Sequence, residues 1–448
     1  MTYATVIVSM IVIGTVLAAY LKLIAVQNQL TGRSQTWNRS VPILEAGIEE
    51  AMAHLNKNGS PEEGVVDLNR MQNDGWWSPG NALRGPWYKF GWMNGDFYFV
   101  GIGSWDGTTN YFPTINSTGW VRQLPAFALR GSRGPFLAQA NEWGSYTRRV
   151  VSTGTTNNPI FERPITARYG IDMNGNNVTV DSYDSTNPTM STSNRYDITK
   201  RRAHGDVASN DTITNTINVG NANIWGRVAT GPLGTIKVGP TGKVGDATWQ
   251  AGTTAGIQPG MSSDDMNIEF PDVVLPTGSD GWLPLVSNPL PSGDYRVPSG
   301  TVNSSIIIAE GAQVRLRIDG GLNLTGTDGL TISSNSNLKL YLNCSSASIG
   351  GKGVINGTGT PIQCQIYGTP KLTSLSIGGN GETTCVIYAP NADVAMNGGG
   401  SGNQDFSGAI VAKSFKFTGH YTVHYDESLA RGALWKGFKI TSWNEKAP

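Results

Sequence analysis

The sequence has little charge and few of the side chains on which most catalytic and metal sites depend. Only 15% of its 448 residues are charged, and 33 basic residues balance 33 acidic ones. This balance gives no electrostatic basis for nucleic-acid binding. The three cysteines are too few for a disulfide scaffold, and the four histidines show no zinc-site spacing. We therefore expect no enzymatic activity, no cofactor and no metal site.

Charge is also absent from the first part of the chain. No charged side chain occurs before Lys22, and the apolar run continues to Val26. At about 1.5 Å per residue, a helix of this length spans the ~30 Å hydrocarbon core of a bilayer. A cleaved secretory signal is the alternative, but signal cores are about 7 to 15 residues long and follow basic residues. The pattern therefore favours a membrane-type helix.

A second helical pattern follows a short polar stretch. Ser40 and Pro42 are typical of a helix start, and Asn58-Gly59 is typical of a helix end. Between them, apolar and small residues recur at helical spacing: Ile43, Leu44, Gly47, Ile48, Ala51, Met52 and Leu55. The sequence thus predicts a helical domain over residues 1–57, with a break near Gly32 or Pro42.

Glycine and aromatic residues are abundant in the rest of the chain. The 57 glycines, together with many Asn, Ser and Thr residues, are typical of an extracellular all-β protein with many turns. Seven of the 13 tryptophans lie close together: Trp76, Trp77, Trp87, Trp92, Trp105, Trp120 and Trp143. We expect a Trp-rich β domain over residues 60–160. Its tryptophans form a core or a contact with a neighbouring subunit, or alternatively a sugar-binding platform.

Residues 161–300 show short β runs separated by Gly and Asn, and they indicate the first coils of a β-solenoid followed by a long excursion. Asn174-Gly175 is typical of a tight hairpin or coil turn. Asp172, Asn174 and Asn176 have the spacing of calcium-loop ligands. However, the glycine follows Asn174 directly and no glutamate stands at position twelve, which excludes an EF-hand.

Residues 301–430 are expected to form the main β-solenoid domain, followed by a C-terminal tail over residues 431–448. Cys344, Cys364 and Cys385 are 20 and 21 residues apart, close to the length of one solenoid coil. This spacing predicts a ladder of three cysteines on successive rungs about 4.8 Å apart, or a disulfide between two neighbours. His420, His424 and Asp426 suggest either a metal site or polar residues that close the last coil. The predicted fold is α+β and mostly β: a long N-terminal helix, an aromatic-rich β domain and a solenoid head.

Three stretches resemble a known family. Leu44 to Leu55, which reads LEAGIEEAMAHL, is similar to type IV pilin-like proteins of the PilX-like branch. Residues 171–246 and 385–430, with VDSYDS, NANIWGRVATGP and YAPNADV, are similar to the uncharacterised β-rich C-terminal domain of such proteins. The chain departs from typical pilins at two positions. Thr5 stands where they have a glutamate, and Lys22 stands close to where they often have a proline.

The resemblance implies a structural subunit of an extracellular filament on a bacterial surface. Its partners would be the inner membrane before assembly, a leader peptidase, the pilus assembly machinery and copies of itself. The helix positions expected to pack in the filament core are Val6, Ile7, Met10, Ile11, Ile13, Gly14, Leu17, Ala18, Leu21 and Ile24. The positions expected to pack the helical stem, residues 1–57, against the β-rich head are Ile43, Leu44, Ile48, Met52 and Leu55.

Two other functions fit parts of the sequence. A minor or tip subunit could act as an adhesin that binds a glycan or a surface. The third hypothesis is a membrane-tethered, polysaccharide-active β-helix enzyme, because many β-helices carry such activities. A similar fold alone is weak evidence for a function. The acidic residues of the coils do not favour an enzyme, since they stand mostly in or beside turns and are not paired: Glu310, Asp319, Asp328, Glu382, Asp393 and Asp405.

Overall fold

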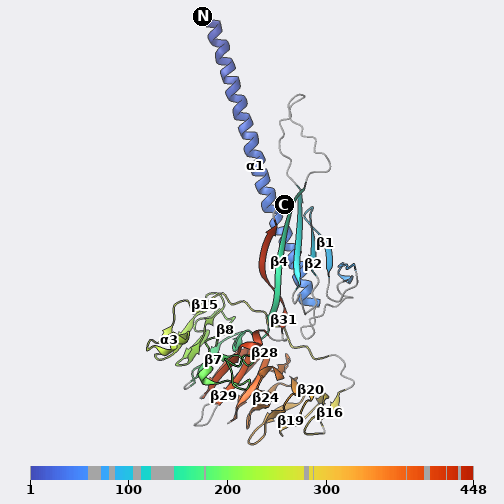
Figure 1. Cartoon of the computed structure of the whole chain (residues 1–448), viewed down its shortest axis with the longest axis vertical. Coiled ribbons are helices and arrows are strands. Elements are labelled where there is room, and N and C mark those ends of the chain that lie inside the picture. Colours follow the sequence, from blue (N-terminus) through green and yellow to red (C-terminus); the bar gives the residue numbers. More distant parts are fainter. Residues whose placement is uncertain are drawn as a thin grey trace. The chain divides into compact units, whose positions relative to one another are not determined.

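The chain forms a long helix followed by a large β region, which is the expected α+β, mostly β class (Figure 1). The computed structural model describes residues 2–58, 72–79, 86–103, 113–122, 146–175, 178–276, 282–285, 287–379, 381–397, 404–419, 421–431 and 435–446. These residues form two compact units. The first comprises Met1–Asn158 and Trp435–Pro448, and the second comprises Pro159–Leu434.

The first unit contains the helix α1, Thr2–Asn58, which runs without interruption through Pro42. The predicted break near Gly32 or Pro42 is therefore wrong. Ser40 does not cap a new helix, because its Oγ donates to the carbonyl of Trp37 at 2.6 Å. Proline removes one backbone donor from a helix. The burial of Ile43 and Leu44 directly after it holds the helical path despite that loss.

The same unit contains an antiparallel sheet of β1 (Trp87–Met93), β2 (Asp96–Ile102), β3 (Thr114–Arg122) and β4 (Tyr146–Pro159). The last strand of the sheet is β31, Trp435–Lys446, beside β4. The residues expected to be a C-terminal tail thus complete this sheet. One face of it packs on α1, and the shared core includes Leu44, Ile48, Trp87, Val100 and Ile115.

The second unit consists of short strands that pair in parallel across successive coils of the chain. The register joins Val314 to Leu338 and Leu338 to Cys364, each one coil further along. The first run of strands is β5 (Ile165–Ala167), β6 (Ile171–Asp172), β7 (Thr179–Tyr183), β8 (Val207–Ser209), β9 (Ile217–Gly220), β10 (Asn223–Trp225), β11 (Val228–Ala229), β12 (Ile236–Val238), β13 (Lys243–Gly245), β14 (Gly256–Ile257) and β15 (Ser262–Ser263), with a short helix α3 (Ala247–Ala251).

The second run begins at Leu283, before residue 301, the expected start of the main β-solenoid domain. Its strands are β16 (Leu283–Pro284), β17 (Gly293–Val297), β18 (Thr301–Val302), β19 (Ile306–Ile308), β20 (Gln313–Ile318), β21 (Gly321–Leu324), β22 (Leu330–Ile332), β23 (Asn337–Leu342), β24 (Ser346–Ile349), β25 (Val354–Asn356), β26 (Cys364–Gly368), β27 (Ser374–Gly378), β28 (Thr383–Asn397), β29 (Gln404–Thr418) and β30 (Tyr421–Asp426).

The two runs are stacked in an order that differs from the order of the sequence. The last coil of the second run pairs with the first coil of the first run, through β29 with β5 and β6 and through β30 with β7. Residues 264–276 contain no strand; Phe270, Val273 and Leu275 pack on an outer cluster of aromatic and aliphatic side chains. We call the place where β29 and β30 pair with β5, β6 and β7 the seam.

The interior of the coils is a single apolar core. Its side chains come from the inward positions of successive strands, such as Leu316, Leu340 and Ile366. Asn174-Gly175 lies at a corner between β6 and β7, and both strands pair in parallel with other coils. It therefore makes a coil turn rather than a hairpin turn.

Candidate functional site

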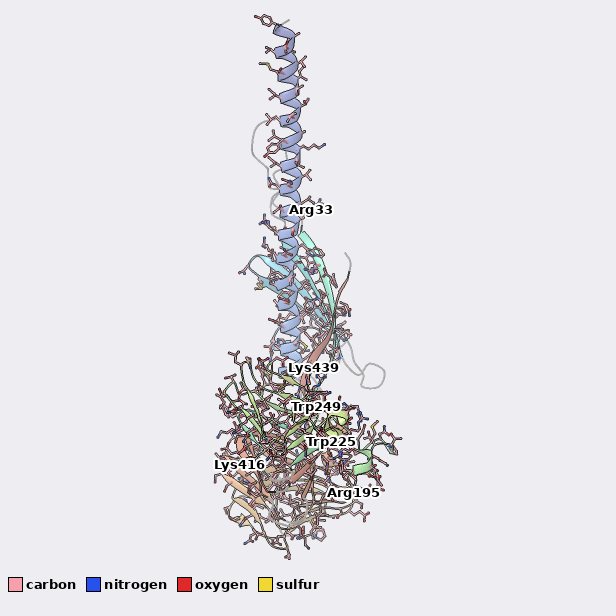
Figure 2. The ribbon with its side chains drawn as sticks, turned by 90° about the vertical axis from the view of Figure 1, so that its left-hand side faces the viewer. Arg33, Arg195, Trp225, Trp249, Lys416 and Lys439 are labelled. Atoms are coloured by element: carbon pink, nitrogen blue, oxygen red, sulfur yellow. The ribbon has the colours of Figure 1, made fainter. Side chains whose placement is uncertain are left out.

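The first candidate site is the N-terminal part of α1, Tyr3–Leu30, which we call the apolar half. An 18-residue window in α1 has a mean hydropathy of 2.3, with none of it buried, so the helix is long and apolar enough to cross a membrane. Side chains project from its whole circumference above Arg33 (Figure 2). A helix that is apolar on all sides is suited to a bilayer or to the centre of a helix bundle.

The residues predicted to pack in a filament core lie on this surface. Met10 is 69% exposed in the single chain. Ile24 is half-buried, and the other predicted positions are exposed: Val6, Ile7, Ile11, Ile13, Gly14, Leu17, Ala18 and Leu21. The remaining faces carry further exposed apolar residues, among them Val8, Val12 and Val16. A Cβ added at Gly14 would meet no atom within 4 Å.

Two hydroxyl groups in the apolar half are bonded within the helix. Ser9 Oγ donates to the carbonyl of Thr5, and Thr15 Oγ1 donates to the carbonyl of Val12, both at 2.8 Å. Polar groups satisfied in this way do not need water. The apolar half can therefore leave water without stranding these hydroxyls.

The C-terminal part of α1, Thr36–Asn56, is the sheet-packed half. Ile43, Leu44, Ile48 and Leu55 are buried against the antiparallel sheet, and Met52 is partly buried against the same core. Gly47 allows the close approach of helix and sheet. A Cβ added there would lie 2.5 Å from Ser117 Oγ and 3.0 Å from the ring of Tyr98. The residues expected to join stem and head thus contact the sheet of their own unit.

Charged groups also fix the sheet-packed half. Arg39 pairs with the buried Asp96 at 2.8 Å, and Lys89 pairs with Glu50 at 2.5 Å. The Tyr98 hydroxyl donates to the same Glu50. Burial first, and then the neighbouring carboxylate, raise the pKa of Tyr98. Tyr98 therefore remains a hydrogen-bond donor at all physiological pH values, and it holds the helix at a fixed position on β2.

The tryptophans of the aromatic zone divide between the two faces of the sheet. Trp76 and Trp87 are buried, whereas Trp77 and Trp92 are 50% and 74% exposed. On the outer face, Phe97 stacks on Trp120 with ring centroids 4.9 Å apart. Trp105 and Trp143 lie outside the described residues. The expected core therefore contains only some of these tryptophans.

The cysteines do not form the predicted three-rung ladder. Leu338, rather than Cys344, is the register partner of Cys364. The pairing of Gln365 with Val386 does place Cys364 and Cys385 on neighbouring rungs, and their side chains are hydrogen-bonded. All three thiols are free and buried. Burial raises the pKa of Cys344 and Cys385, which keeps these thiols protonated and unreactive.

His424 belongs to a buried polar cluster at the last coil. Its Nδ1 lies 2.6 Å from Asp181 Oδ1, and the ring of Tyr196 stacks on it at 3.4 Å. The Tyr196 hydroxyl donates to the other oxygen of Asp181. Asp426 Oδ1 accepts from the backbone N–H groups of Ser428 and Ser185. His420 lies outside the described residues, within which no group of metal-ligating side chains occurs.

Four acidic residues of the coils are held by cationic or hydroxyl partners: Asp319, Asp328, Glu382 and Asp393. Asp319 accepts from Arg296 and Arg317, both at 2.7 Å. Glu382 lies 3.6 Å from Arg195, and Asp393 pairs with Lys413 at 3.0 Å. Burial alone would raise the pKa of Asp319, but hydrogen bonds from Asn343 and the two arginines lower it overall. Such carboxylates act as fixed anions that join neighbouring coils.

Comparison with known proteins adds three findings. A family described as a domain of unknown function (DUF7305) matches residues 284–432, the second run of coils. No curated protein matches the chain. Among solved structures, the competence-associated pilin ComZ from Thermus thermophilus is similar with a TM-score of 0.31 and 11% identity, over 91% of this chain and 96% of that chain. A TM-score of this size supports neither a shared fold nor a shared function.

Proposed function

We propose that this protein is a structural subunit of a type IV pilus-like extracellular filament, which polymerises through the apolar half of α1. The observation that carries the proposal is the contrast along one unbroken helix. The sheet-packed half is buried within its own unit, whereas the apolar half is exposed on every side. The pilin-like sequence LEAGIEEAMAHL lies in the sheet-packed half.

The proposed energetic basis is the removal of apolar side chains from water. Full burial of one Val, Leu, Ile or Met side chain is worth roughly 1.5–3 kcal/mol. The bilayer supplies this burial before assembly, and helices of other copies supply it in the filament. The partners of this process would be the inner membrane, a leader peptidase and the pilus assembly machinery, and the product would lie on the bacterial surface.

Helix register in the filament needs a device other than a carboxylate in the apolar half, because no acidic residue stands among residues 3–30. Gly14, Ala18 and Ala19 are the proposed contact positions. Small residues on a helix surface let a second helix approach closely. In the single chain the space beside Gly14 is open.

Electron microscopy of surface material, with an antibody against the coils, tests the proposal. We expect continuous filaments labelled along their length from the unaltered chain. We expect none from Ile13→Asp, which puts a charge into the apolar half. The matched control is Leu233→Asp, at an 84% exposed position on a turn of the coils, and it should leave filaments unchanged.

Other labelling patterns would favour the other functions. Label confined to filament tips would favour a minor subunit that acts as an adhesin. Isolated membrane-bound monomers that degrade a polysaccharide would overturn the filament proposal in favour of an enzyme. Normal filaments from Ile13→Asp would contradict the role of the apolar half.

A further inference from the structure

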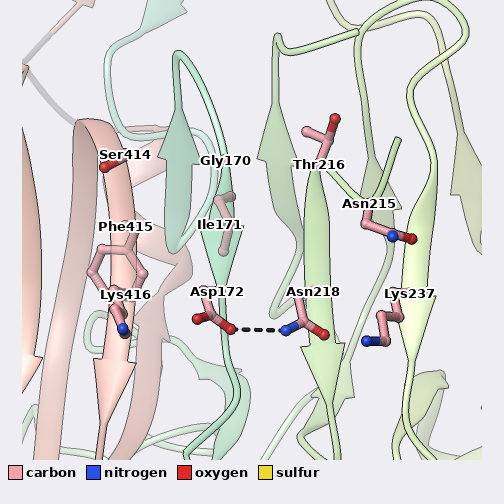
Figure 3. A pocket seen from close by; sticks show the side chains of 10 residues that line it. All are labelled: Gly170, Ile171, Asp172, Asn215, Thr216, Asn218, Lys237, Ser414, Phe415 and Lys416. Carbon is pink, nitrogen blue, oxygen red and sulfur yellow. Dashed lines mark hydrogen bonds between the residues drawn. The ribbon is translucent and has the colours of Figure 1, made fainter. Parts of the chain in front are cut away.

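The seam between the two runs of coils contains a polar hollow. It has a volume of about 440 Å³ and lies over β29, β6, β9 and β12 (Figure 3). A second hollow of about 260 Å³ adjoins it and shares Asp172 and Lys416. Gly170 lines the first hollow, and Gly175 and Gly419 line the second. The absence of side chains at these positions keeps the surface open.

A row of outward side chains crosses the hollow. Lys416, Asp172, Asn218 and Lys237 are register partners on four neighbouring strands. Figure 3 shows them at one level, with Asp172 and Asn218 pointing toward each other. The same register extends the row over the second run of coils through Ala395, Ser376, Ser348 and Asn323. Neighbouring positions are about 4.8 Å apart, so this row is a regular track of mostly small, polar groups.

The two lysines of the row are available to a ligand. Lys416 and Lys237 are both exposed, and neither forms an ion pair with another residue in the described part of the chain. Asp172 between them is already engaged, because its Oδ1 accepts from Asn218 Nδ2 at 2.9 Å and from the backbone N–H of Asn174 at 3.2 Å. The hollow thus presents two ammonium groups three strands apart, with the side chains of Asp172 and Asn218 between them in the row.

The floor of the hollow offers no apolar anchor. Phe415 and Ile171 line it but are only 2% exposed, because their side chains point into the core. Protein partners usually bind through buried aromatic or aliphatic anchors. A ligand chain that is rich in hydroxyl groups and carries anionic groups can bind through hydrogen-bond donors and acceptors alone, and this surface offers both. The lining of the hollow carries two ammonium groups and one carboxylate, and this excess of positive charge favours an anionic chain over a neutral one.

We propose that the seam binds an acidic polysaccharide, with Lys416 and Lys237 contacting carboxylates on different sugar residues. Asn218 and Asn215 bind hydroxyl groups between these carboxylates. The proposal concerns the coils alone and does not depend on polymerisation through α1. It would give the proposed filament a surface that holds acidic glycans.

The test is titration calorimetry with the full chain in detergent micelles. The probes are a galacturonate oligosaccharide and a neutral galactose oligosaccharide of equal length. We expect binding of the acidic probe that weakens with salt, and much weaker binding of the neutral probe. Lys416→Gln combined with Lys237→Gln should weaken acidic binding about tenfold, since each exposed ion pair contributes a few-fold.

Lys371→Gln is the matched control, because Lys371 is an exposed lysine on a turn away from the hollow. It should leave the affinity unchanged. Equal binding of the two probes would overturn the proposal, as would an affinity weaker than about 1 mM. An equal loss in Lys371→Gln would show a diffuse charge effect instead of a site. Loss of self-association, rather than of glycan binding, in the double variant would assign the seam to contact with a second copy.

Discussion

The two halves of α1 have the same backbone conformation and opposite surroundings. Leu44 in the sheet-packed half is 1% exposed, and Leu17 in the apolar half is 55% exposed. The difference lies in how the residues are distributed around the helix. The sheet-packed half has one apolar stripe with glutamates off it, whereas the apolar half carries apolar residues on all sides up to Leu21, and Lys22, Gln27 and Asn28 follow only toward its C-terminal end. A stripe can be buried by one sheet, but a helix that is apolar on all sides needs an apolar environment around it.

Removal of a large side chain from each half gives the largest expected contrast. Leu44→Ala should lower the free energy of unfolding of the first unit by about 2–5 kcal/mol, because it leaves a cavity against the sheet. Leu17→Ala should change it by less than about 0.5 kcal/mol. Denaturant unfolding of the full chain in detergent, followed by tryptophan fluorescence, measures both. Equal effects would show that the two halves are not distinct in the folded chain.

A charge in the apolar half should affect the membrane and leave the sheet intact. Ile13→Asp should cost about 3–4 kcal/mol in bilayer insertion, since Ile13 lies near the middle of the apolar run. The share of protein that resists alkaline extraction from membranes should fall, while the thermal unfolding of the sheet stays the same. Unchanged membrane retention would contradict a spanning role.

The two glycines of the helix provide a smaller and matched contrast. Gly47→Leu should destabilise the first unit by about 1–3 kcal/mol, because the added side chain meets Ser117 and Tyr98. Gly14→Leu should leave the stability of the single chain unchanged but prevent filament formation. Thermal unfolding and electron microscopy separate the two effects. Normal filaments from Gly14→Leu would remove Gly14 from the proposed helix contact.

The smallest expected effect concerns the end of the sheet-packed half. Asn56 Nδ2 donates to the carbonyl of Phe438 at 3.2 Å, and Asn56 Oδ1 accepts from its backbone N–H at 2.6 Å. Asn56→Ala should therefore lower the free energy of unfolding by about 0.5–1.5 kcal/mol. The effect is small because water can bond to the backbone groups of Phe438 that lose their partner. Asn38→Ala, at an exposed position of the same helix, should be nearly neutral. An equal change in both variants would mean that the contact with β31 does not stabilise the helix.

Local patterns predicted the helical and β regions but not the way in which distant segments meet. Apolar spacing identified the stripe that includes Ile48, because a helix repeats every 3.6 residues whatever its surroundings. Equal spacing of the cysteines did not predict their register. Coil length varies, so Leu338 rather than Cys344 lies beside Cys364. The C-terminal strand β31 had no local signal that linked it to a sheet formed by residues far earlier in the chain.

The sequence by itself determined that this chain has an uncharged membrane-length helix, an amphipathic continuation and a glycine-rich β region. These properties depend on side-chain chemistry and short-range periodicity. Only the tertiary structure decided that α1 passes through Pro42, that the last coil stacks on the first, and that Lys416 and Asp172 meet at the seam. These two residues are 244 positions apart in the sequence, and no local pattern predicts that they meet. Their pairing depends on the order in which the coils stack and not on the residues beside either position.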